Sequence, residues 1–294
     1  MYKSFHTFGI IAPAGKLSRE KFDSGVDWLR SEGKTVKLSE HVNAPYPVEY
    51  LSSSAEERAK DLTALWLDSE VDLLLATRGG FGSAHLLPLL DWNALKSRPN
   101  LPLAGFSDIT ALHWTMEKLG IGRPIAGPML GKLAESSQCA YTTRYNDLAF
   151  ESSSYTIEAA PEYGDFLPLK PGKAAGLPLV GNLSVAVTLC GTPYMPDVAG
   201  RILILEDLNE PIYKLDRYLT TLEQNGVFAR CAGVLFGQFT DCATNQKLIA
   251  LLQRFANGVN GPVIANFPFG HTREICTVDF HREMSVENLN ISVR

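Results

Sequence analysis

The sequence lacks the features of a membrane-bound or secreted protein. No apolar run approaches the roughly 18 residues that a membrane-spanning helix needs. The short apolar run near the start predicts a first strand rather than a secretion signal. The five cysteines are scattered and odd in number, without a C-x-x-C pair, which favours reduced thiols in the core over disulfides. We therefore expect a cytoplasmic protein that does not associate with membranes.

Signatures of nucleic-acid, nucleotide and metal binding are absent as well. The formal net charge is −5, and Lys and Arg are nowhere clustered among aromatic residues, so no nucleic acid is expected as a partner. The chain contains no G-x-G-x-x-G, no P-loop, no H-E-x-x-H and no Cys/His cluster, so we expect neither a cofactor nor a metal. The 294 residues are 45% hydrophobic, which is enough for a core in one large domain or two ordinary ones.

Apolar segments alternate with amphipathic helical segments along the first half of the chain. Runs rich in Leu, Ile and Val between such helices are typical of a parallel sheet covered on both faces. We therefore predict an α/β fold with a doubly wound parallel sheet. The expected strands are 8–12, 35–38, 71–77 and 101–105, and the expected helices include 18–31 and 54–67.

The composition changes near residue 150. The segment 151–175 is rich in Ser, Pro and Gly, which is typical of a linker rather than of a helix or strand. We interpret 1–150 as an N-terminal domain and 176–294 as a second domain. The second domain is expected to hold a helix over 212–225 that ends at Gly226, and strands over 201–205, 232–236, 277–280 and 291–293.

The segment 101–110, L-P-L-A-G-F-S-D-I-T, predicts a buried strand that turns sharply into a helix with Ser107 at the corner. Backbone N–H groups at a helix N-terminus can stabilise an oxyanion, so this position suits a nucleophile. The hydrolase elbow G-x-S-x-G is only half present, because Gly105 fills the first glycine position and Ile109 the second. The alternative is that Ser107 merely caps the helix.

A glycine-rich turn, R-G-G-F-G over residues 78–82, follows a neighbouring strand. Ligands of such sheets bind beyond the carboxyl ends of the strands, so this turn and Ser107 should face one crevice. The turn could bind an anion, or it could simply be a tight connection between strand and helix.

A serine nucleophile needs a base, and His271 is the best placed histidine. It follows the apolar strand segment 262–267 in a loop that contains proline and glycine, and loops at strand ends commonly carry catalytic residues. We expect His113 to pack or bond locally rather than to reach back to Ser107, and His281 to lie at the surface. The remaining three lack polar company in the sequence: His6, His41 and His85.

The strand 201–205 ends in two acids, Glu206 and Asp207. Such acids could simply cap the next helix. However, a carboxylate on the last residue of a strand is partly buried and needs a partner, and an imidazole would serve. Ser107, Glu206 and His271 each close an apolar strand, which makes them a candidate triad, although their order in the chain is weak evidence alone.

Taken together, these segments resemble the LD-carboxypeptidases, the muramoyltetrapeptide carboxypeptidases of bacterial peptidoglycan recycling. The matching segments follow the family's order along nearly the whole chain: I-I-A-P (10–13), T-R-G-G-F-G (77–82), G-F-S-D-I-T (105–110), G-P-M (127–129), G-N-L-S (181–184), G-T-P (191–193), L-I-L-E-D (203–207) and F-G-H (269–271). Phe81 is a departure, since relatives commonly have an aromatic hydroxyl there.

The resemblance implies a flavodoxin-like N-terminal domain that carries the nucleophile, and a smaller β-rich α/β domain that carries the acid and the histidine. It implies a Ser107–Glu206–His271 triad in a cytoplasmic homodimer. The backbone N–H of Asp108, with that of Gly79 or Gly80, would form the oxyanion hole.

The implied reaction releases the terminal D-alanine of peptidoglycan tetrapeptides by cleaving the L,D-peptide bond after diaminopimelate or lysine. Arg78 is a candidate partner for the D-alanine carboxylate, although it could instead form a structural ion pair. Two alternatives remain: a microcin self-immunity-type peptidase that acts on aminoacyl-nucleotide conjugates, and a non-catalytic muropeptide-binding protein. A cofactor-binding α/β protein is a remote third.

Overall fold

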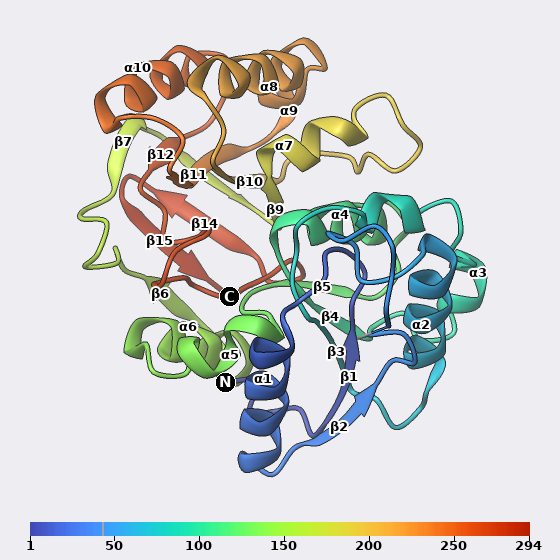
Figure 1. Ribbon diagram of the computed structural model, residues 1–294. Coiled ribbons are helices and arrows are strands. Elements are labelled where there is room, and N and C mark those ends of the chain that lie inside the picture. The colour runs from blue at the N-terminus through green and yellow to red at the C-terminus, as the bar shows by residue number, and fades with distance from the viewer. Residues whose placement is uncertain (43) are drawn as a thin grey trace.

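The computed structural model describes residues 1–42 and 44–294, and its strands form three sheets (Figure 1). The first sheet has the order β13-β5-β4-β3-β1-β2. Its first five strands are parallel in the order 2-1-3-4-5, which is the flavodoxin type of doubly wound sheet. The predicted α/β class is therefore confirmed. The strands are β1 (Thr7–Ile11), β2 (Thr35–Leu38), β3 (Leu73–Ala76), β4 (Pro102–Gly105), β5 (Arg123–Ala126) and β13 (Val278–Asp279).

Helices cover both faces of this sheet, as the alternation of apolar segments predicts. In Figure 1, α1 and α5 lie on one side of the sheet, and α2, α3 and α4 lie on the other. Each face has its own cluster of buried apolar side chains. The helices are α1 (Arg19–Ser31), α2 (Ala55–Leu67), α3 (Trp92–Leu95), α4 (Thr110–Leu119), α5 (Leu130–Ser136) and α6 (Ala140–Glu151), with short 3₁₀ turns η1 (Ser83–Leu86) and η2 (Ser107–Ile109).

Local capping explains where the two predicted N-terminal helices begin. The Ser18 side chain accepts a hydrogen bond from the N–H of Lys21 at the start of α1. Ser54 and Glu57 form a reciprocal capping box at the start of α2. These caps satisfy backbone N–H groups that have no partner within the helix.

The second sheet has the order β7-β12-β11-β10-β9, in which β9 to β12 are parallel and β7 is antiparallel. The third sheet, β6-β15-β14-β8, is antiparallel throughout. The helices that accompany them are α7 (Leu183–Ala186), η3 (Val187–Leu189), α8 (Ile212–Gln224), α9 (Val227–Arg230) and α10 (Asn245–Ala256). The strands are β6 (Tyr155–Ile157), β7 (Leu167–Lys170), β8 (Lys173–Gly176), β9 (Pro178–Asn182), β10 (Ile202–Leu208), β11 (Gly233–Thr240), β12 (Val263–Ala265), β14 (Met284–Glu287) and β15 (Asn290–Val293).

Two features differ from the sequence-based expectation. The segment 151–175 was expected to hold no element, yet it contains β6 and β7 and most of β8. The strand expected over 277–280 exists as β13, but it pairs with β5 at the edge of the first sheet rather than within the second half of the chain. The chain therefore returns to its first sheet before it ends. The division at residues 150 and 176 stays a prediction.

The helices are amphipathic and short. Within 1–42 and 44–294, none of them combines the length and apolarity needed to cross a bilayer. Four of the five cysteines are buried and the fifth is partly buried, which agrees with the expectation that most of them lie in the core.

Candidate active site

Ser107 sits at the corner between β4 and α4 in a backbone conformation that is rare for a residue with a side chain. Its φ is +63°, in the left-handed region, and such strain is retained mainly where the surroundings enforce it. The interpretation of Ser107 as a helix cap is wrong, because Phe106 is the residue that precedes η2 and no side chain caps either η2 or α4.

Two glycines make room for this corner. A Cβ on Gly105 would lie 3.0 to 3.2 Å from side-chain atoms of Ile109, so Ile109 packs where the elbow motif normally has a second glycine. A Cβ on Gly79 would lie 2.8 Å from the Cβ of Ser107 and 2.9 Å from its Oγ. The glycine-rich turn after β3 therefore lies directly against the serine, as the sequence predicts.

The structure brings Ser107, His271 and Glu206 into one hydrogen-bonded chain. His271 Nε2 lies 2.9 Å from Ser107 Oγ, and His271 Nδ1 lies 2.8 Å from Glu206 Oε2. If Nδ1–H donates to the carboxylate, Nε2 is left to accept the serine proton. The centroids of the Phe106 and His271 rings lie 5.1 Å apart, so Phe106 packs against the imidazole.

Glu206 is 0% exposed, so its carboxylate depends on donors from the protein. Besides the imidazole, Asn182 Nδ2 donates to its Oε1 at 3.1 Å. A Cβ on Gly237 would lie 2.4 Å from the backbone oxygen of Phe269 and 3.3 Å from the Cβ of Glu206. Glycine at 237 thus lets the loop that leads to the histidine pack onto the acid.

Asp207 lies beside the triad, although sequence reasoning gave it no role. Its carboxylate accepts hydrogen bonds from the N–H groups of Ser184 and Leu208, both at 2.8 Å, and from Asn182 Nδ2 at 3.1 Å. Burial, and to a lesser extent the nearby Glu206, raises the pKa of Asp207 to about 6, although the hydrogen bonds that the carboxylate accepts lower it. Asn182 was missed as well. The available signal was its position at the end of β9, in the G-N-L-S segment.

The predicted oxyanion donors lie next to each other. A Cβ on Gly79 would lie 3.1 Å from the backbone nitrogen of Asp108. Among the described residues, no group accepts a hydrogen bond from the backbone N–H of Asp108, Gly79 or Gly80. The Asp108 side chain points elsewhere, because it accepts from the N–H of Ser83 at 2.8 Å, and burial raises its pKa.

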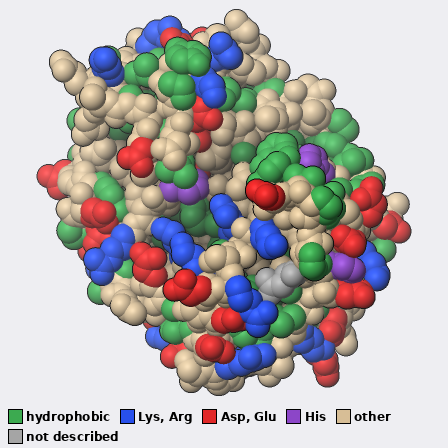
Figure 2. Space-filling model, in the orientation of Figure 1, with side chains coloured by type: hydrophobic (Ala, Val, Ile, Leu, Met, Phe, Trp, Pro, Cys, Tyr) green, Lys and Arg blue, Asp and Glu red, His purple; other side chains and the backbone are tan. Residues whose placement is uncertain are grey.

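Ser107 and His271 open into a cleft of about 530 Å³. The cleft is lined by charges of opposite sign, with the acids Asp207 of β10 and Glu210, just after this strand, on one side. Three cations line the other side: Lys21, Arg78 and Lys132. Figure 2 shows Lys and Arg side chains gathered around the middle of this face.

Arg78 does not form the structural ion pair that was its alternative interpretation. Its side chain is exposed and donates to the backbone oxygen of Lys16 at 3.0 Å. Within the part of the chain that the structure describes, no carboxylate lies within 4.0 Å of its guanidinium. Its charge is therefore available to a ligand in the cleft.

A second cavity of about 480 Å³ adjoins the cleft on the other side of His271. It lies between α10, the end of β11 and residues 162–163, and Lys132 and His271 border both cavities.

Two of the other histidines lie as expected. His113 is buried and bonds to the backbone oxygen of Leu103 at 3.0 Å, and burial lowers its pKa to about 4. His281 lies at the surface and pairs with Glu117 at 3.0 Å. Neither contacts the serine.

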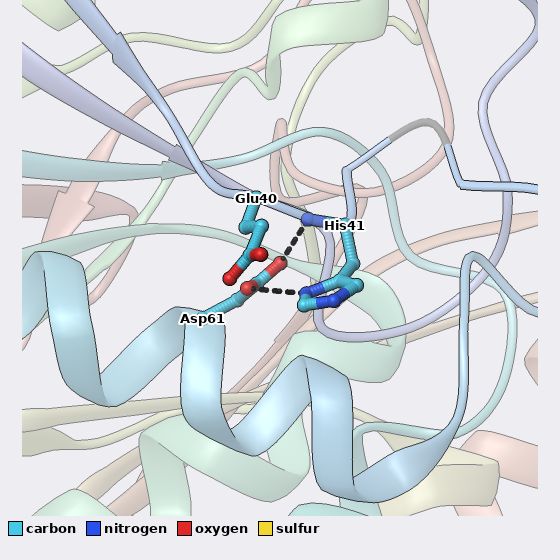
Figure 3. Close-up of side chains that lie close together, drawn as sticks. All are labelled: Glu40, His41 and Asp61. Carbon is cyan, nitrogen blue, oxygen red and sulfur yellow. Dashed lines mark hydrogen bonds and ion pairs between the residues drawn. The ribbon is translucent and has the colours of Figure 1, made fainter.

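The expectation that His41 and His85 lack polar company is wrong. His85 Nδ1 lies 3.4 Å from Nη2 of Arg58. In His41, ring Nδ1 and the backbone N–H each lie 2.9 Å from an oxygen of Asp61, and this hydrogen bonding raises the His41 pKa (Figure 3). Ligand-type atoms of Glu40, His41 and Asp61 lie within 4.8 Å of one another, but Glu40 pairs with Lys60 at 2.9 Å. Existing partners thus account for this cluster.

Family models match most of the chain. The model described as the LD-carboxypeptidase N-terminal domain matches residues 8–125, and the one described as the LD-carboxypeptidase C-terminal domain matches residues 175–286. The chain belongs to the LD-carboxypeptidase family. The resemblance noted from the sequence is thereby confirmed.

Individual relatives agree with this LD-carboxypeptidase assignment. A putative carboxypeptidase of Streptomyces coelicolor is 34% identical over 92% of this chain and 87% of its own length. The murein tetrapeptide carboxypeptidase of Pseudomonas aeruginosa is 30% identical over 89% of this chain and 87% of its own length. The crystal structure of an MccF-like protein from Bacillus anthracis superposes with a TM-score of 0.88 at 25% identity, over 98% of this chain and 96% of that one. The carboxypeptidase relatives support a peptidase.

Proposed function

We propose that this LD-carboxypeptidase family member is a serine carboxypeptidase that releases the terminal D-alanine from peptidoglycan-derived tetrapeptides. The observation that carries the proposal is the chain from Ser107 Oγ through the His271 imidazole to the buried Glu206 carboxylate, with contacts of 2.9 and 2.8 Å at one edge of an open cleft. The relatives named as murein peptide carboxypeptidases supply the substrate class.

In the first step, Ser107 Oγ attacks the carbonyl carbon of the L,D-peptide bond while His271 Nε2 takes the hydroxyl proton. The new bond to carbon forms as the carbonyl electron pair moves onto oxygen, which becomes an oxyanion. Glu206 holds the ring with Nδ1 protonated and stabilises the imidazolium that results.

The oxyanion is placed against the backbone N–H of Asp108 and one N–H of the glycine turn. A Cβ on Gly80 would have the Cα of Gly15 as its nearest neighbour, at 3.5 Å, whereas a Cβ on Gly79 would lie 2.8 Å from the Cβ of Ser107. Gly79 therefore lies closer to the serine. Each such donor contributes on the order of 10² to 10³ in rate.

In the second step, the carbon–nitrogen bond breaks and the imidazolium of His271 gives its proton to the leaving amine of D-alanine. Water then attacks the acyl-enzyme with His271 again acting as the base, which releases the tripeptide and restores Ser107. Arg78 holds the free carboxylate of D-alanine, because a guanidinium without an acidic partner forms strong hydrogen bonds to such a group.

The test is mass spectrometry of purified muramoyl tetrapeptides, with diaminopimelate or lysine, after incubation with the protein and with the Ser107→Ala variant. Loss of one alanine with the wild type alone supports the proposal. Cleavage of an aminoacyl sulfamoyl nucleotide in place of the tetrapeptides would favour the microcin-type alternative. Binding of tetrapeptide without cleavage of either substrate would favour a binding protein.

A further inference from the structure

We propose that Asn182 is a positioning residue that holds Glu206 charged and aligned with the nucleophile. The inference rests on the triad of the proposed function. It starts from one residue at the end of β9, whose side chain contacts both acids of β10 and whose backbone N–H contacts the first residue of α4.

The Asn182 amide has two N–H hydrogens, and two carboxylates take them. Nδ2 lies 3.1 Å from Glu206 Oε1 and 3.1 Å from Asp207 Oδ1. Asn182 and Glu206 are register partners on adjacent parallel strands, so both side chains leave the sheet on the same face. On the other side of β10, Glu206 alone faces Gly237 and Gln238 of β11, a bulge that twists the strand end.

The orientation of the amide follows from its oxygen. Asn182 Oδ1 accepts hydrogen bonds from the N–H of Val185 at 3.2 Å and from the hydroxyl of Ser184 at 2.8 Å, which makes Asn182 the N-cap of α7. A flipped amide would point its NH₂ group at a backbone N–H donor and its oxygen at two carboxylates. The cap therefore directs the donors at the acids.

The backbone of the same residue contacts the helix that follows the nucleophile. The Asn182 N–H donates to Thr110 Oγ1 at 2.9 Å, and Thr110 lies three residues after Ser107 at the start of α4. Four residues further along α4, Trp114 Nε1 donates to the backbone oxygen of Val180 at 2.8 Å. The strand that orients the acid is thus tied to the helix that carries the serine.

The two acids differ in how much they depend on Asn182. Asp207 also accepts from the N–H groups of Ser184 and Leu208. Glu206, among the described residues, has only Asn182 and His271 as donors. A hydrogen bond to the charged form of a buried carboxyl favours that form, and the charged form is the one that stabilises the imidazolium. The titratable groups around Glu206 are His271 and Asp207, with Cys242 and Glu210 further along the same edge.

Asn182→Ser separates positioning from folding. Serine is a favoured N-cap, so α7 keeps its start, but its side chain is too short to donate to both acids. We expect kcat to fall by about 10- to 100-fold, the range for a lost hydrogen bond to a charged group, with KM changed less than threefold. Because Glu206 loses a donor to its charged form, the acid limb of the kcat profile should move to higher pH.

Three comparisons make the result decisive. Asn146→Ser removes another fully buried asparagine, which bonds Thr277 away from the site, and should leave the pH profile unchanged. In a Glu206→Gln background, Asn182→Ser should have little further effect, because both changes act through one carboxylate. Asn182→Thr, which also supplies a favoured N-cap and lacks the amide, replaces the serine variant if that one does not fold.

The readout does not depend on the proposed substrate. Labelling of Ser107 by a fluorophosphonate reports the triad directly, and D-alanine release reports the proposed reaction. Labelling that slows in Asn182→Ser supports the inference even if tetrapeptides are not cleaved. A folded Asn182→Ser protein with wild-type labelling and an unmoved pH profile would overturn it, and so would a wild-type Ser107 that does not react.

Discussion

Replacing Gly79 by alanine tests how closely the glycine turn is fitted to the nucleophile. The added Cβ would lie 2.8 Å from Ser107 Cβ and 2.9 Å from Oγ, both under the distance at which real contacts occur. Non-bonded carbon atoms settle at about 3.5 to 4.0 Å. Gly79 does not have a positive φ, so alanine can adopt the same backbone conformation. The substitution therefore tests only the available space.

The magnitude follows from this overlap. The turn and the serine must separate by about 1 Å, and a misplacement of that size costs on the order of 100-fold in rate, or about 2.7 kcal/mol of transition-state stabilisation. The same crowding should lower the free energy of unfolding by about 1 to 3 kcal/mol, the usual range for overpacking. Ser107 cannot simply rotate away, because Oγ must stay near His271 Nε2, now 2.9 Å distant.

The assay is kcat/KM for D-alanine release, with fluorophosphonate labelling of Ser107 and a thermal unfolding curve to show that the variant is folded at the assay temperature. Gly258→Ala is the matched control, since its Cβ would lie 3.5 Å from its nearest neighbours, an ordinary contact, and it should keep activity within about twofold. A folded Gly79→Ala enzyme with wild-type kcat/KM would refute the packing argument.

Three further predictions follow from the site. Ser107→Ala should abolish D-alanine release and leave the fold intact. The effects of Ser107→Ala and His271→Ala on kcat should be non-additive. If the fold-loss in the double variant equals the product of the two single losses, the two residues do not act as a unit. Arg78→Met should raise KM by about 10- to 100-fold with little change in kcat, because the D-alanine carboxylate loses its partner. The variant should also cleave a tetrapeptide and its C-terminal amide equally well. If the variant prefers the free carboxylate as strongly as the wild type does, Arg78 is excluded as the carboxylate partner. Because burial raises the pKa of Asp207 from 3.8 to about 6, the folded state holds a proton there that the unfolded state has lost, so this residue's contribution to stability should fall between pH 4 and 6 by about 3 kcal/mol. Urea unfolding of wild type and Asp207→Asn at pH 4 and pH 7 measures it, and a difference between the two proteins that does not change with pH would contradict the assignment.

The residues at the ends of apolar strands were predictable from the sequence. Ser107 follows β4 of the first sheet, whereas Glu206 lies near the end of β10 and His271 follows β12, both in the second sheet. Parallel strands bring such ends to one edge within each sheet, but the meeting of the two edges has no local signal. The helices at 19–31 and 55–67 were predictable as well, because Ser18 and Ser54 supply local caps. In each case the signal lies within a few residues of the feature.

Asn182 could not be assigned from the sequence, because its importance comes from partners at 110, 206 and 207. Its local pattern, a polar residue at the end of a strand, marks a helix cap but does not reveal those partners. The pairing of β13 with β5 was hidden for a similar reason, since only two residues of each strand take part. Contacts between distant segments leave little trace in periodicity.

The strands of 151–175 were missed for a physical reason. β6 and β8 form the two edges of the third sheet, and β7 is an edge of the second. Edge strands tolerate proline and glycine, because one side of the strand makes no ladder hydrogen bonds. Pro168 lies in β7, opposite Ile264, where the register is irregular. Composition typical of a linker is thus compatible with the margin of a sheet.

The return of the chain to its first sheet through β13 has a consequence for how the molecule can move and be divided. The first sheet is joined to the rest of the protein on both sides of β13 as well as after α6, so a rotation of one half against the other would have to bend several connections at once. A fragment that stops near residue 150 would leave the edge of β5 uncovered and would lose the Arg123–Asp279 ion pair. The second half of the chain thus supplies a strand and an ion pair that complete the first sheet.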